Sequence, residues 1–375
     1  MINLVPFGSV CSLQNGRAFK PEEWSASGTP IVRIQNLNDE TKPFNYCDFE
    51  VEKRFHVDSG DLLFSWSGTP GTSFGAFFWN RGKGFLNQHI FRVDIDERHI
   101  DKNYLRYAIN SKLDLIIDQA HGGVGLKHIT KGKLEAVDIP LPPRPEQKRI
   151  AAILDKADAI RRKRQQAIQL ADDFLRAVFL DMFGDPVSNP KGWEVKPLGS
   201  LVVNKDGKRI PIKASDRADM AGEYPYYGAS GVIDYVNDFI FEGRHLLVGE
   251  DGANLLARST PIAFIADGRY WVNNHAHVLG EKNGLSLDYL EFSINMRGLE
   301  SFVSGSAQPK LNQENLNKIP IQVPPLILVD KFSAILNGCR EYIGKMIISE
   351  PEVLFSSLSQ KAFSGQLFAR KSPCV

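Results

Sequence analysis

A proline-rich step followed by a helix-forming run occurs twice in this chain of 375 residues. The first copy, IPLPPRPEQKRIAAIL, ends at Leu154, and the second, IPIQVPPLILVDKFSAIL, ends at Leu336. Pro143 and Pro325 lie 182 positions apart (325 − 143), and so do the two leucines (336 − 154). A spacing that is kept over a whole motif indicates that the chain is built from two related halves.

Further matched segments follow the same order in both halves. The offset falls from 191 at the front (197 − 6, for Pro6 and Pro197) to 182 at the proline step, as insertions and deletions in a diverged duplication would produce. We therefore interpret the chain as an internal duplication. The matched pairs are VPFGSV and KPLGSL (from Val5 and Lys196), FLNQHIFRV and WVNNHAHVL (from Phe85 and Trp271), and YLRYAIN and YLEFSIN (from Tyr104 and Tyr289).

The globular part of each half, about 1–140 and 190–320, alternates short apolar runs with Gly, Asn, Asp and Pro turns. Runs such as DLLFSW and HLLVGE are typical of strands, whereas NYLRYAINSKLDLII is typical of a helix. The predicted fold class is α+β, with two tandem α+β domains separated by two long helices that pack as an antiparallel coiled coil. The predicted boundaries are 1–143 and 187–325 for the domains, 144–186 for the central helix and 326–375 for the C-terminal helix.

Apolar residues at steps of three and four predict both helices, and antiparallel packing would make them a spacer between the domains. Gly184 and Pro186 supply a stop after Phe183. The basic run Arg161–Arg164 is either a solvated flank or a stripe that faces phosphates or an acidic partner. The predicted seams are Ile150, Ile153, Ala157, Ile160, Ala167, Ala171, Phe174 and Val178, and Phe332, Ile335, Cys339, Tyr342 and Met346.

The second helix should be interrupted. Phe179 and Phe363 align at an offset of 184 (363 − 179), so two residues have entered the second copy after its proline step. Ser349 and Glu352 have the spacing of a capping box, and Pro351 suits the first turn of a new helix. We predict a break at 348–351 that turns Leu354, Leu358 and Phe363 onto the first helix or the first domain, whereas the first helix runs unbroken from about 148 to 183.

The overall composition excludes several classes of protein. The net charge of +1 does not by itself indicate a nucleic-acid partner. The four cysteines are scattered and form no CxxC, which fits a reducing compartment and argues against a zinc site. The first residues do not resemble a signal peptide, and no apolar run is long enough to span a membrane. We therefore expect a cytoplasmic protein with no membrane partner.

A search for catalytic motifs finds none. The segment Gly68–Gly75 lacks the lysine of an ATP-binding loop, and Ser188–Lys191 does not match the Asn/Asp-Pro-Pro-Tyr/Phe loop of base methylases. His275 and His277 could face one metal ion from a strand, but without a nearby carboxylate or cysteine set they are better interpreted as structural histidines. We expect no catalytic residue, no cofactor and no metal.

With these motifs in view, the chain resembles the specificity subunits of Type I restriction–modification enzymes. The residues that carry the resemblance are the twice-used proline step with its helix, YPYYGASGVIDYV from Tyr224 to Val236, and SGSAQPKLNQENL before the second step. The resemblance implies two target-recognition domains, each reading one half of a bipartite site in double-stranded DNA. It also implies that the helices set the gap between the halves and dock two DNA methyltransferase (modification) subunits, and through them the restriction endonuclease/translocase subunits.

The second proline step departs from the first, because Leu-Ile-Leu-Val-Asp replaces Arg-Pro-Glu-Gln-Lys. Docking through the second helix should therefore differ from docking through the first.

Base reading requires side chains with hydrogen-bond donors and acceptors on exposed loops. Ordinary solvated loops are the alternative interpretation for about half of the candidates. Asn87–His89 and Asn273–His275 occupy matched positions between apolar residues, and for them we favour a structural role. The DNA-binding candidates are Arg33, Gln35, Asn36, Ser65, Ser67, Thr69, Lys127 and His128 in the first half, and Tyr226, Tyr227, Asn254, Arg258, Ser306, Gln308 and Lys310 in the second.

Two other classes of function remain open. The chain could be a stand-alone DNA methyltransferase or nuclease, against which the missing motifs speak, or an adaptor whose duplicated domains bind protein. Cleavage or methylation without a partner would favour the first of these, and a failure to shift DNA would favour the second.

The repeat predicts that the halves work as modules. Exchanging residues 1–140 for another domain of this type should change one half of the recognised DNA site and leave the other half unchanged. Sequencing the methylated sites in cells that carry the exchanged chain measures this. A simultaneous change of both halves would show that the domains do not read independently.

Overall fold

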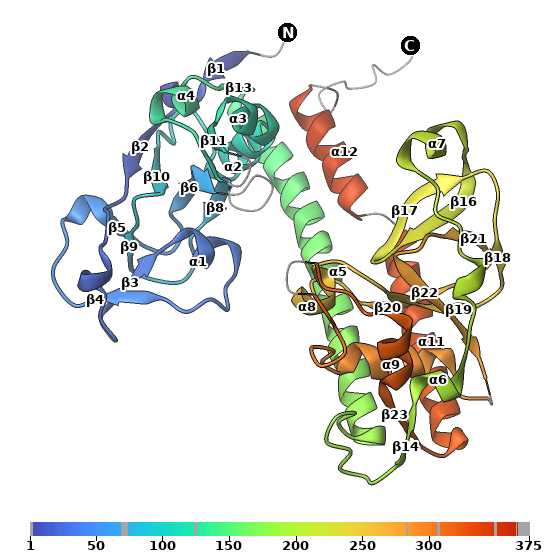
Figure 1. Cartoon of the computed structure of the whole chain (residues 1–375). Helices are drawn as coiled ribbons and strands as arrows, with labels where there is room; N and C mark the ends of the chain where they lie inside the picture. The colour runs from blue at the N-terminus through green and yellow to red at the C-terminus, as the bar shows by residue number, and fades with distance from the viewer. Residues whose placement is uncertain are drawn as a thin grey trace. The chain divides into compact units, whose positions relative to one another are not determined.

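The computed structural model describes residues 3–68, 74–123, 126–282, 284–305, 308–348, 351–364 and 366. The chain divides into two compact units, which are described separately below (Figure 1). Unit 1 contains residues 1–164 together with 350–375, and unit 2 contains residues 165–349. Each unit contains one α+β domain, so the predicted fold class is confirmed at this level.

The domain of unit 1 contains two four-stranded sheets and two smaller groups of strands. The first sheet has the order β2-β10-β6-β8 and the second the order β4-β3-β9-β5, while β1 pairs with β13 and β11-β12-β7 form a small sheet. The strands are β1 (Leu4–Pro6), β2 (Cys11–Asn15), β3 (Thr29–Val32), β4 (Asn45–Cys47), β5 (His56–Val57), β6 (Leu62–Ser65), β7 (Ser67–Gly68), β8 (Gly75–Phe78), β9 (Gly84–Leu86), β10 (Ile90–Ile95), β11 (His121–Gly123), β12 (Leu126–His128) and β13 (Asp138–Pro140). The helices are α1 (Ile34–Asn38), α2 (Lys102–Asn110), α3 (Leu113–Gln119) and α4 (Lys131–Glu135), with 3₁₀ turns η1 (Phe7–Ser9), η2 (Pro21–Glu23) and η3 (Lys53–Phe55).

The domain of unit 2 repeats this plan. Its sheets have the orders β15-β22-β19-β20 and β17-β16-β21-β18, and β14 pairs with β23. The strands are β14 (Glu194–Pro197), β15 (Val202–Asn204), β16 (Ala221–Gly228), β17 (Gly231–Val236), β18 (Phe241–Glu242), β19 (His245–Gly249), β20 (Ala263–Ala266), β21 (Arg269–Val272), β22 (Ala276–Glu281) and β23 (Pro320–Val323). The helices are α6 (Leu198–Leu201), α7 (Ala214–Asp219), α8 (Asn254–Ala257), α9 (Leu287–Met296) and α10 (Gln313–Lys318), with the 3₁₀ turn η4 (Asp206–Lys208).

Strand register confirms the duplication that the sequence predicts. The parallel pair β3–β9 places Ile31 beside Phe85, and the parallel pair β16–β21 places Tyr226 beside Trp271. The NQH and NNH motifs therefore begin at equivalent points, two residues after Phe85 and Trp271.

The matched helices α2 and α9 anchor the sheets through one asparagine each. Asn110 accepts a hydrogen bond from the backbone N–H of Ala76 (2.8 Å) and donates one to its carbonyl (3.0 Å). Asn295 brackets Ala263 in the same way, at 3.1 Å and 2.7 Å. Each side chain therefore caps an edge strand, β8 or β20, that has no further strand beside it.

The helix α5 (Arg144–Phe183) is a single helix of 40 residues and is the predicted central helix. It ends where Gly184 adopts a φ of +79°, a conformation that a glycine accepts without strain. At 1.5 Å per residue the helix is about 60 Å long.

The buried face of α5 differs from the predicted seam. Ile160 is 47% exposed and Phe174 is 52% exposed, although both were placed in the seam. In unit 2 the buried residues of α5 are Leu175, Phe179 and Phe183. A one-residue step turns the side chain by about 100°, so choosing Leu175 as the buried residue leaves Phe174 in solvent. The domain core therefore decides which face of the helix is buried.

The helix α11 (Leu326–Ile348) packs beside the C-terminal part of α5 within unit 2. The rings of Phe179 and Phe332 are 5.4 Å apart, and those of Phe183 and Tyr289 are 4.9 Å apart. The start of α11 therefore meets the end of α5, so the two helices run in opposite directions there. Helix α9 contributes Tyr289 and Phe292 to the same aromatic cluster.

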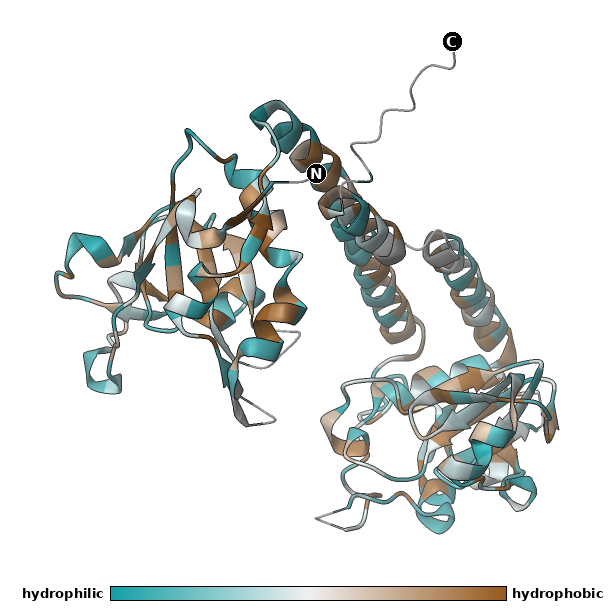
Figure 2. Ribbon diagram, turned by 90° about the horizontal axis from the view of Figure 1, so that it is seen from above, coloured by the Kyte–Doolittle hydropathy of each residue, from teal (hydrophilic) through white to brown (hydrophobic). Residues whose placement is uncertain are grey.

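A separate helix, α12 (Pro351–Phe363), follows α11, and residues 349–350 lie outside the described part of the chain. Leu358 and Phe363 pack against the core of unit 1, and the rings of Phe363 and Tyr104 are 5.8 Å apart. Leu354, which was expected to turn inward with them, is exposed. In Figure 2 the hydrophobic segments gather inside each unit, and the peripheral loops are mostly hydrophilic.

In each unit, an ion pair joins the domain to a long helix, and the two units exchange the positions of the cation and the anion. In unit 1, Arg106 on α2 pairs with Asp155 on α5 (3.2 Å). In unit 2, Arg340 on α11 pairs with Glu291 on α9 (2.6 Å). The domain supplies the cation in the first case and the anion in the second.

The bracketing asparagines should contribute measurably to stability. Replacing Asn110 or Asn295 by Ala should lower the free energy of unfolding by about 1–3 kcal/mol, because two edge-strand backbone groups lose their partner. Asn103 on α2 is exposed and is the matched control, so Asn103→Ala should stay within about 0.5 kcal/mol of the parent. Denaturant unfolding of the three variants measures these differences, and equal stabilities would contradict this role for the asparagines.

Candidate nucleic-acid interface

In both domains, several of the predicted base-reading residues lie in loops that begin where strands of the two sheets end. In unit 1, Arg33 follows β3, Ser67 lies just after β6, and His89 connects β9 to β10. In unit 2 the corresponding connections are those after β19 and between β21 and β22. This edge of each domain is called the loop edge below.

The first group of candidates lies at the start of α1. Gln35 is exposed, whereas Asn36 is only 1% exposed. The Asn36 amide donates to the carbonyls of Lys42 and Pro43 (both 3.2 Å), and its oxygen accepts from the Arg33 backbone N–H (3.1 Å). Asn36 therefore holds the loop in shape, while Gln35 faces solvent.

The Arg33 side chain is half-buried and is held from two sides. Its guanidinium donates to the Asn45 side chain (2.8 Å) and lies over the Trp24 ring (5.3 Å). Burial, and then the charge of Arg33, lower the pKa of His89. Arg33 therefore keeps its charge close to the 87–89 connection and favours a neutral His89.

The second group surrounds the small sheet of unit 1. His128 pairs with Ser67, and Lys127 pairs with Gly68, in the ladder between β12 and β7. Ser65 and Ser67 are buried, His128 is exposed and Lys127 is half-buried, with its ammonium near the Ile117 carbonyl (3.3 Å). The structure thus brings Ser67, Lys127 and His128 together. Thr69 lies outside the described residues.

Three buried polar atoms of the first loop edge have no hydrogen-bond partner among the described residues. They are the Trp66 indole nitrogen, the Gln88 side-chain oxygen and the His89 Nδ1. The Gln88 side-chain oxygen and His89 Nδ1 therefore give no support to the structural role that was predicted for these two residues.

The two tyrosines of the second domain differ in environment. Tyr226 is buried, and its hydroxyl accepts from the Ile212 backbone N–H (3.0 Å). Tyr227 is half-buried between Phe264 and Tyr270, and burial raises its pKa. Both residues contribute to the packing of the sheet.

Asn254 and Arg258 belong to the short helix α8 and its end. The Asn254 oxygen accepts from the backbone N–H of Thr260 (3.0 Å) and the hydroxyl of Ser259 (2.8 Å). Arg258 has a φ of +53°, and its guanidinium donates to the Arg297 carbonyl. Burial lowers the pKa of Arg258. Both side chains therefore hold local backbone in place.

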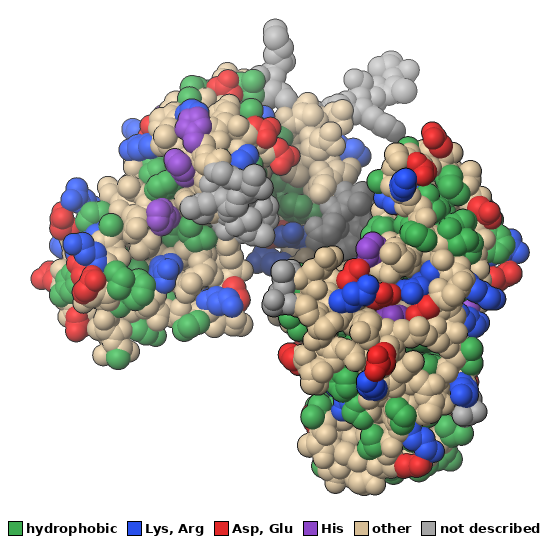
Figure 3. All heavy atoms as spheres, viewed as in Figure 1, with side chains coloured by type: hydrophobic (Ala, Val, Ile, Leu, Met, Phe, Trp, Pro, Cys, Tyr) green, Lys and Arg blue, Asp and Glu red, His purple; other side chains and the backbone are tan. Residues whose placement is uncertain are grey.

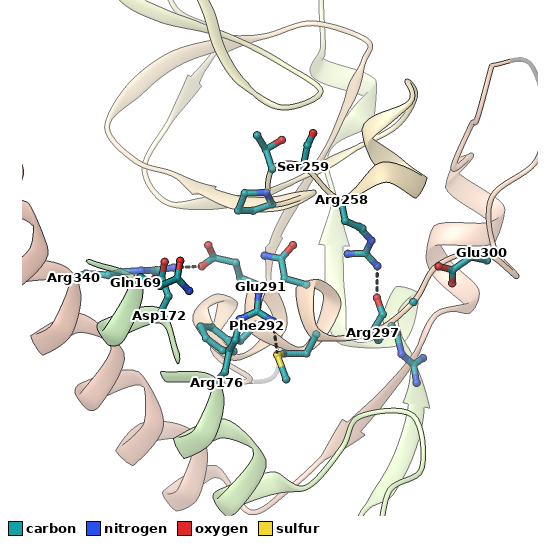
Figure 4. Close-up of a pocket in the computed structure, with 15 residues that line it drawn as sticks. Gln169, Asp172, Arg176, Arg258, Ser259, Glu291, Phe292, Arg297, Glu300 and Arg340 are labelled. Carbon is teal, nitrogen blue, oxygen red and sulfur yellow. Dashed lines mark hydrogen bonds and ion pairs between the residues drawn. The ribbon is translucent and has the colours of Figure 1, made fainter. Parts of the chain in front are cut away.

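Arg258 also lines a pocket of about 620 Å³ in unit 2 (Figure 4). Asp172 and Arg176 of α5 face it from one side, while Glu291 of α9 meets Arg340 of α11. Burial raises the pKa of Glu291 despite the nearby Arg340 charge. Charged side chains of both signs line this pocket.

Gln308 and Lys310 face solvent on the loop edge of unit 2. Lys310 pairs with Glu250 (3.2 Å), and its backbone forms bridges with Asp251 and Ser304. The structure therefore brings the 308–311 segment next to the loop after β19. Ser306 lies outside the described residues.

His275 and His277 bind different carboxylates. His275 Nδ1 is 2.7 Å from Asp251 Oδ2, and His277 Nδ1 is 2.6 Å from Asp206 Oδ2. Across the described ranges no group of three or more His, Cys, Asp and Glu side chains is arranged to hold a metal ion. The two histidines therefore make polar contacts of their own.

The basic run on α5 is partly neutralised. Arg161 and Arg162 both pair with the buried Asp158, at 2.8 Å and 3.0 Å. On the visible face of each unit, Lys/Arg and Asp/Glu side chains are interspersed (Figure 3), in keeping with the net charge of +1. Within the described residues, no helix is long and apolar enough to cross a membrane.

Comparison with known proteins decides the family. A family model described as the type I restriction modification DNA specificity domain matches twice, at residues 3–170 and 190–331. The chain belongs to this family. Each of the two matches covers one domain and a proline step, as the duplication requires, so both domains are specificity domains.

The relatives agree with this assignment. A Haemophilus influenzae protein described as a type I restriction enzyme specificity subunit is 35% identical over 145 residues, which cover 39% of this chain and 37% of that protein. The EcoBI specificity subunit of Escherichia coli is 28% identical over 181 residues, 46% of this chain and 37% of that subunit. The matched region thus spans little more than a third of either relative.

A solved structure shares the fold of the whole chain. The S subunit of a type I restriction–modification system from M. genitalium aligns with a TM-score of 0.62 and covers 96% of both chains. Because its sequence is only 17% identical, it supports the fold and carries no information about individual residues.

The buried ion network around His277 was missed by sequence reasoning. Asp206, Arg209 and Glu250 are far from His277 in the chain and match no motif. The repeat contained one indication, which is that Glu250 and Trp66 occupy equivalent positions in the two domains. The Glu250 N–H donates to the His275 carbonyl, and the Trp66 N–H donates to the His89 carbonyl.

Substitutions at Asn36 and Gln35 should distinguish an effect on protein stability from an effect on DNA recognition. Asn36→Ala should lower the free energy of unfolding by about 1–3 kcal/mol, because three hydrogen bonds are lost. Gln35→Ala should leave stability within about 0.5 kcal/mol and weaken binding to DNA that carries the recognised site. Thermal unfolding and DNA titration of both variants test this. Normal DNA binding by Gln35→Ala would remove Gln35 from the candidates.

Proposed function

We propose that this chain is the sequence-specific recognition subunit of a type I restriction–modification complex and acts on double-stranded DNA. The observation that carries the proposal is the presence of two specificity domains with the same strand order, joined by one continuous helix. Two copies of one DNA specificity domain suit a DNA site that is made of two separate halves.

The loop edges supply the chemistry for base reading. Gln35, His128, Gln308 and Lys310 are exposed there and offer donors and acceptors of the kind that base edges recognise. The remaining described candidates are half-buried or buried, so we assign them to holding the loops in shape. We place this function in the cytoplasm, where the DNA of a restriction–modification system lies.

We assign no catalytic role to the chain itself. The titratable groups around His277 bond to one another. Asp206 contacts both His277 and Arg209, and His277 also contacts the Leu311 carbonyl. Such a saturated cluster has no group poised to attack or to accept a proton from a substrate. Cleavage and adenine methylation would belong to the partner subunits.

The helices offer a surface for those partners. Leu170 and Phe174 of α5, and Ile327 and Tyr342 of α11, are more than half exposed. Apolar side chains in such numbers on helices indicate a protein interface. Because the pattern occurs on both long helices, we propose two methyltransferase subunits for each chain, with restriction subunits attached through them.

The proposal also gives the long helices a role in setting the distance between the two half-sites. A helix of about 60 Å is as long as about 18 base pairs of DNA at about 3.4 Å each. We propose that this length fixes the unread gap between the two half-sites, as half-site spacing follows protein geometry in other DNA-binding proteins.

A gel-shift experiment with and without the methyltransferase subunit tests the function. A sequence-selective shift that depends on the partner supports the proposal. Cleavage or methylation by the chain alone would identify it as an enzyme, and the absence of any shift with the partner present would favour a protein-binding adaptor.

Salt dependence gives a second, quantitative test. Because the net charge is +1, the isolated chain should release few counterions when it binds DNA, and the slope of log K against log [salt] should steepen when the methyltransferase subunits join. Fluorescence anisotropy at several salt concentrations measures both slopes. Equal slopes would show that the chain supplies most of the phosphate contacts itself.

A further inference from the structure

The loop edge of unit 2 contains a buried network of ionised groups centred on His277. The His277 side chain is 1% exposed, and its two ring nitrogens point at two different acceptors. Nδ1 is 2.6 Å from Asp206 Oδ2, and Nε2 is 2.8 Å from the Leu311 carbonyl oxygen. A neutral imidazole has one N–H, so only the imidazolium can donate to both acceptors at once.

Two carboxylates and two cations surround His277. Glu250 Oε2 lies 3.8 Å from Nδ1 and faces the ring from the loop after β19, while Asp206 faces it from η4. Burial opposes ionisation of both carboxyls. The contact with His277 nevertheless holds the pKa of Asp206 below its ordinary range, and the contact with Arg209 does the same for the pKa of Glu250. The cations of the network are Arg209 and Lys310, which pair with these same carboxylates.

The network holds the 308–311 segment from several sides. The Leu311 carbonyl accepts from His277, the Leu311 N–H donates to the Glu250 carbonyl (2.7 Å), and Lys310 pairs with the Glu250 carboxylate (3.2 Å). If His277 loses a proton, either Asp206 or Leu311 loses its donor. The exposed Gln308 and Lys310 belong to this segment.

The first domain fills the equivalent place with aromatic rings. The N–H of Ile129 donates to the Trp66 carbonyl as that of Leu311 does to the Glu250 carbonyl, so Trp66 occupies the place of Glu250. Phe91 stands two residues after His89, as His277 stands two after His275. The rings of Trp66 and Phe91 stack at 5.6 Å. This contact does not titrate, so the duplicated domains hold the same segment by different physical means.

We propose that His277, together with Asp206 and Glu250, is a positioning residue for DNA reading by the second domain only, and that its positive charge adds to the backbone hydrogen bonds that hold the 308–311 segment in place. This inference rests on the proposed function. It predicts that recognition of one half-site depends on pH through His277, while recognition of the other half-site does not.

The test uses the chain in complex with its methyltransferase subunits. The probes are a DNA duplex carrying the methylated site found in cells and two duplexes with one half scrambled. Affinity is measured from about pH 6 to about pH 9, where a histidine loses its charge and a lysine keeps it. Discrimination against the duplex scrambled in the second domain's half should fall at least about ten-fold as the pH rises (about 1.4 kcal/mol per ten-fold), and discrimination in the other half should stay constant.

Three substitutions distinguish positioning from general stability. His277→Lys keeps a cation and should flatten the pH profile at full discrimination, whereas His277→Phe, which copies the first domain's Phe91, should lose second-half discrimination at every pH. His245 is the matched control, because it is also buried and lies on the neighbouring strand β19, but it bonds to Tyr270 and Lys205. His245→Phe should leave the pH profile unchanged.

Hydrogen exchange provides a readout if a variant binds poorly. Exchange of the peptide that covers 308–311, corrected for intrinsic pH dependence, should rise in His277→Phe while that of the β11–β12 peptide stays constant. A wild-type profile that is flat with pH, or second-half discrimination retained by His277→Phe, would overturn this inference. A complex that reads neither half would instead contradict the proposed function.

Discussion

Each domain is closed by the pairing of its first strand with its last. The ladder of β1 with β13, and that of β14 with β23, bring the start and the end of each domain together just before a proline step. The Tyr104 hydroxyl donates to the Pro140 carbonyl, and that of Tyr289 to the Gln322 carbonyl, which lock the last strand to a helix of its own domain. The chain therefore leaves each domain beside the point where it entered, an arrangement that suits the duplication of a domain.

The helices follow from this closure. Each proline step delivers the chain directly into a helix, and the helix buries the face that its domain core offers. Leu154 joins the core of unit 1, and Phe179 and Phe332 join the core of unit 2. The apolar residues that the cores do not use, such as Leu170 and Phe174, remain exposed. One continuous helix thus contributes to two cores and retains an apolar surface.

The sequence was sufficient for the duplication, because YLRYAIN and YLEFSIN carry the bracketing asparagines and the locking tyrosines that each domain requires. It was also sufficient for the long helix, whose end is marked by Gly184. The helix seam could not be predicted, because burial of Phe179 rather than Phe174 depends on rings supplied by α9 and α11. The His277 network was equally hidden, since its members come from strand β22 and from three segments far from it in the chain. Among the site candidates, Gln35 and Asn36 are alike in sequence and opposite in burial, and only the fold separates them.

The central claim is that two copies of one reader recognise two separate halves of a DNA site. The most direct measurement is modified-base sequencing of the genome of cells that express this chain with its methyltransferase, before and after the chain is deleted. The account predicts methylated adenines in a motif of two defined halves with a constant unread gap, and loss of that methylation on deletion. A single contiguous motif, or methylation that persists without the chain, would contradict it.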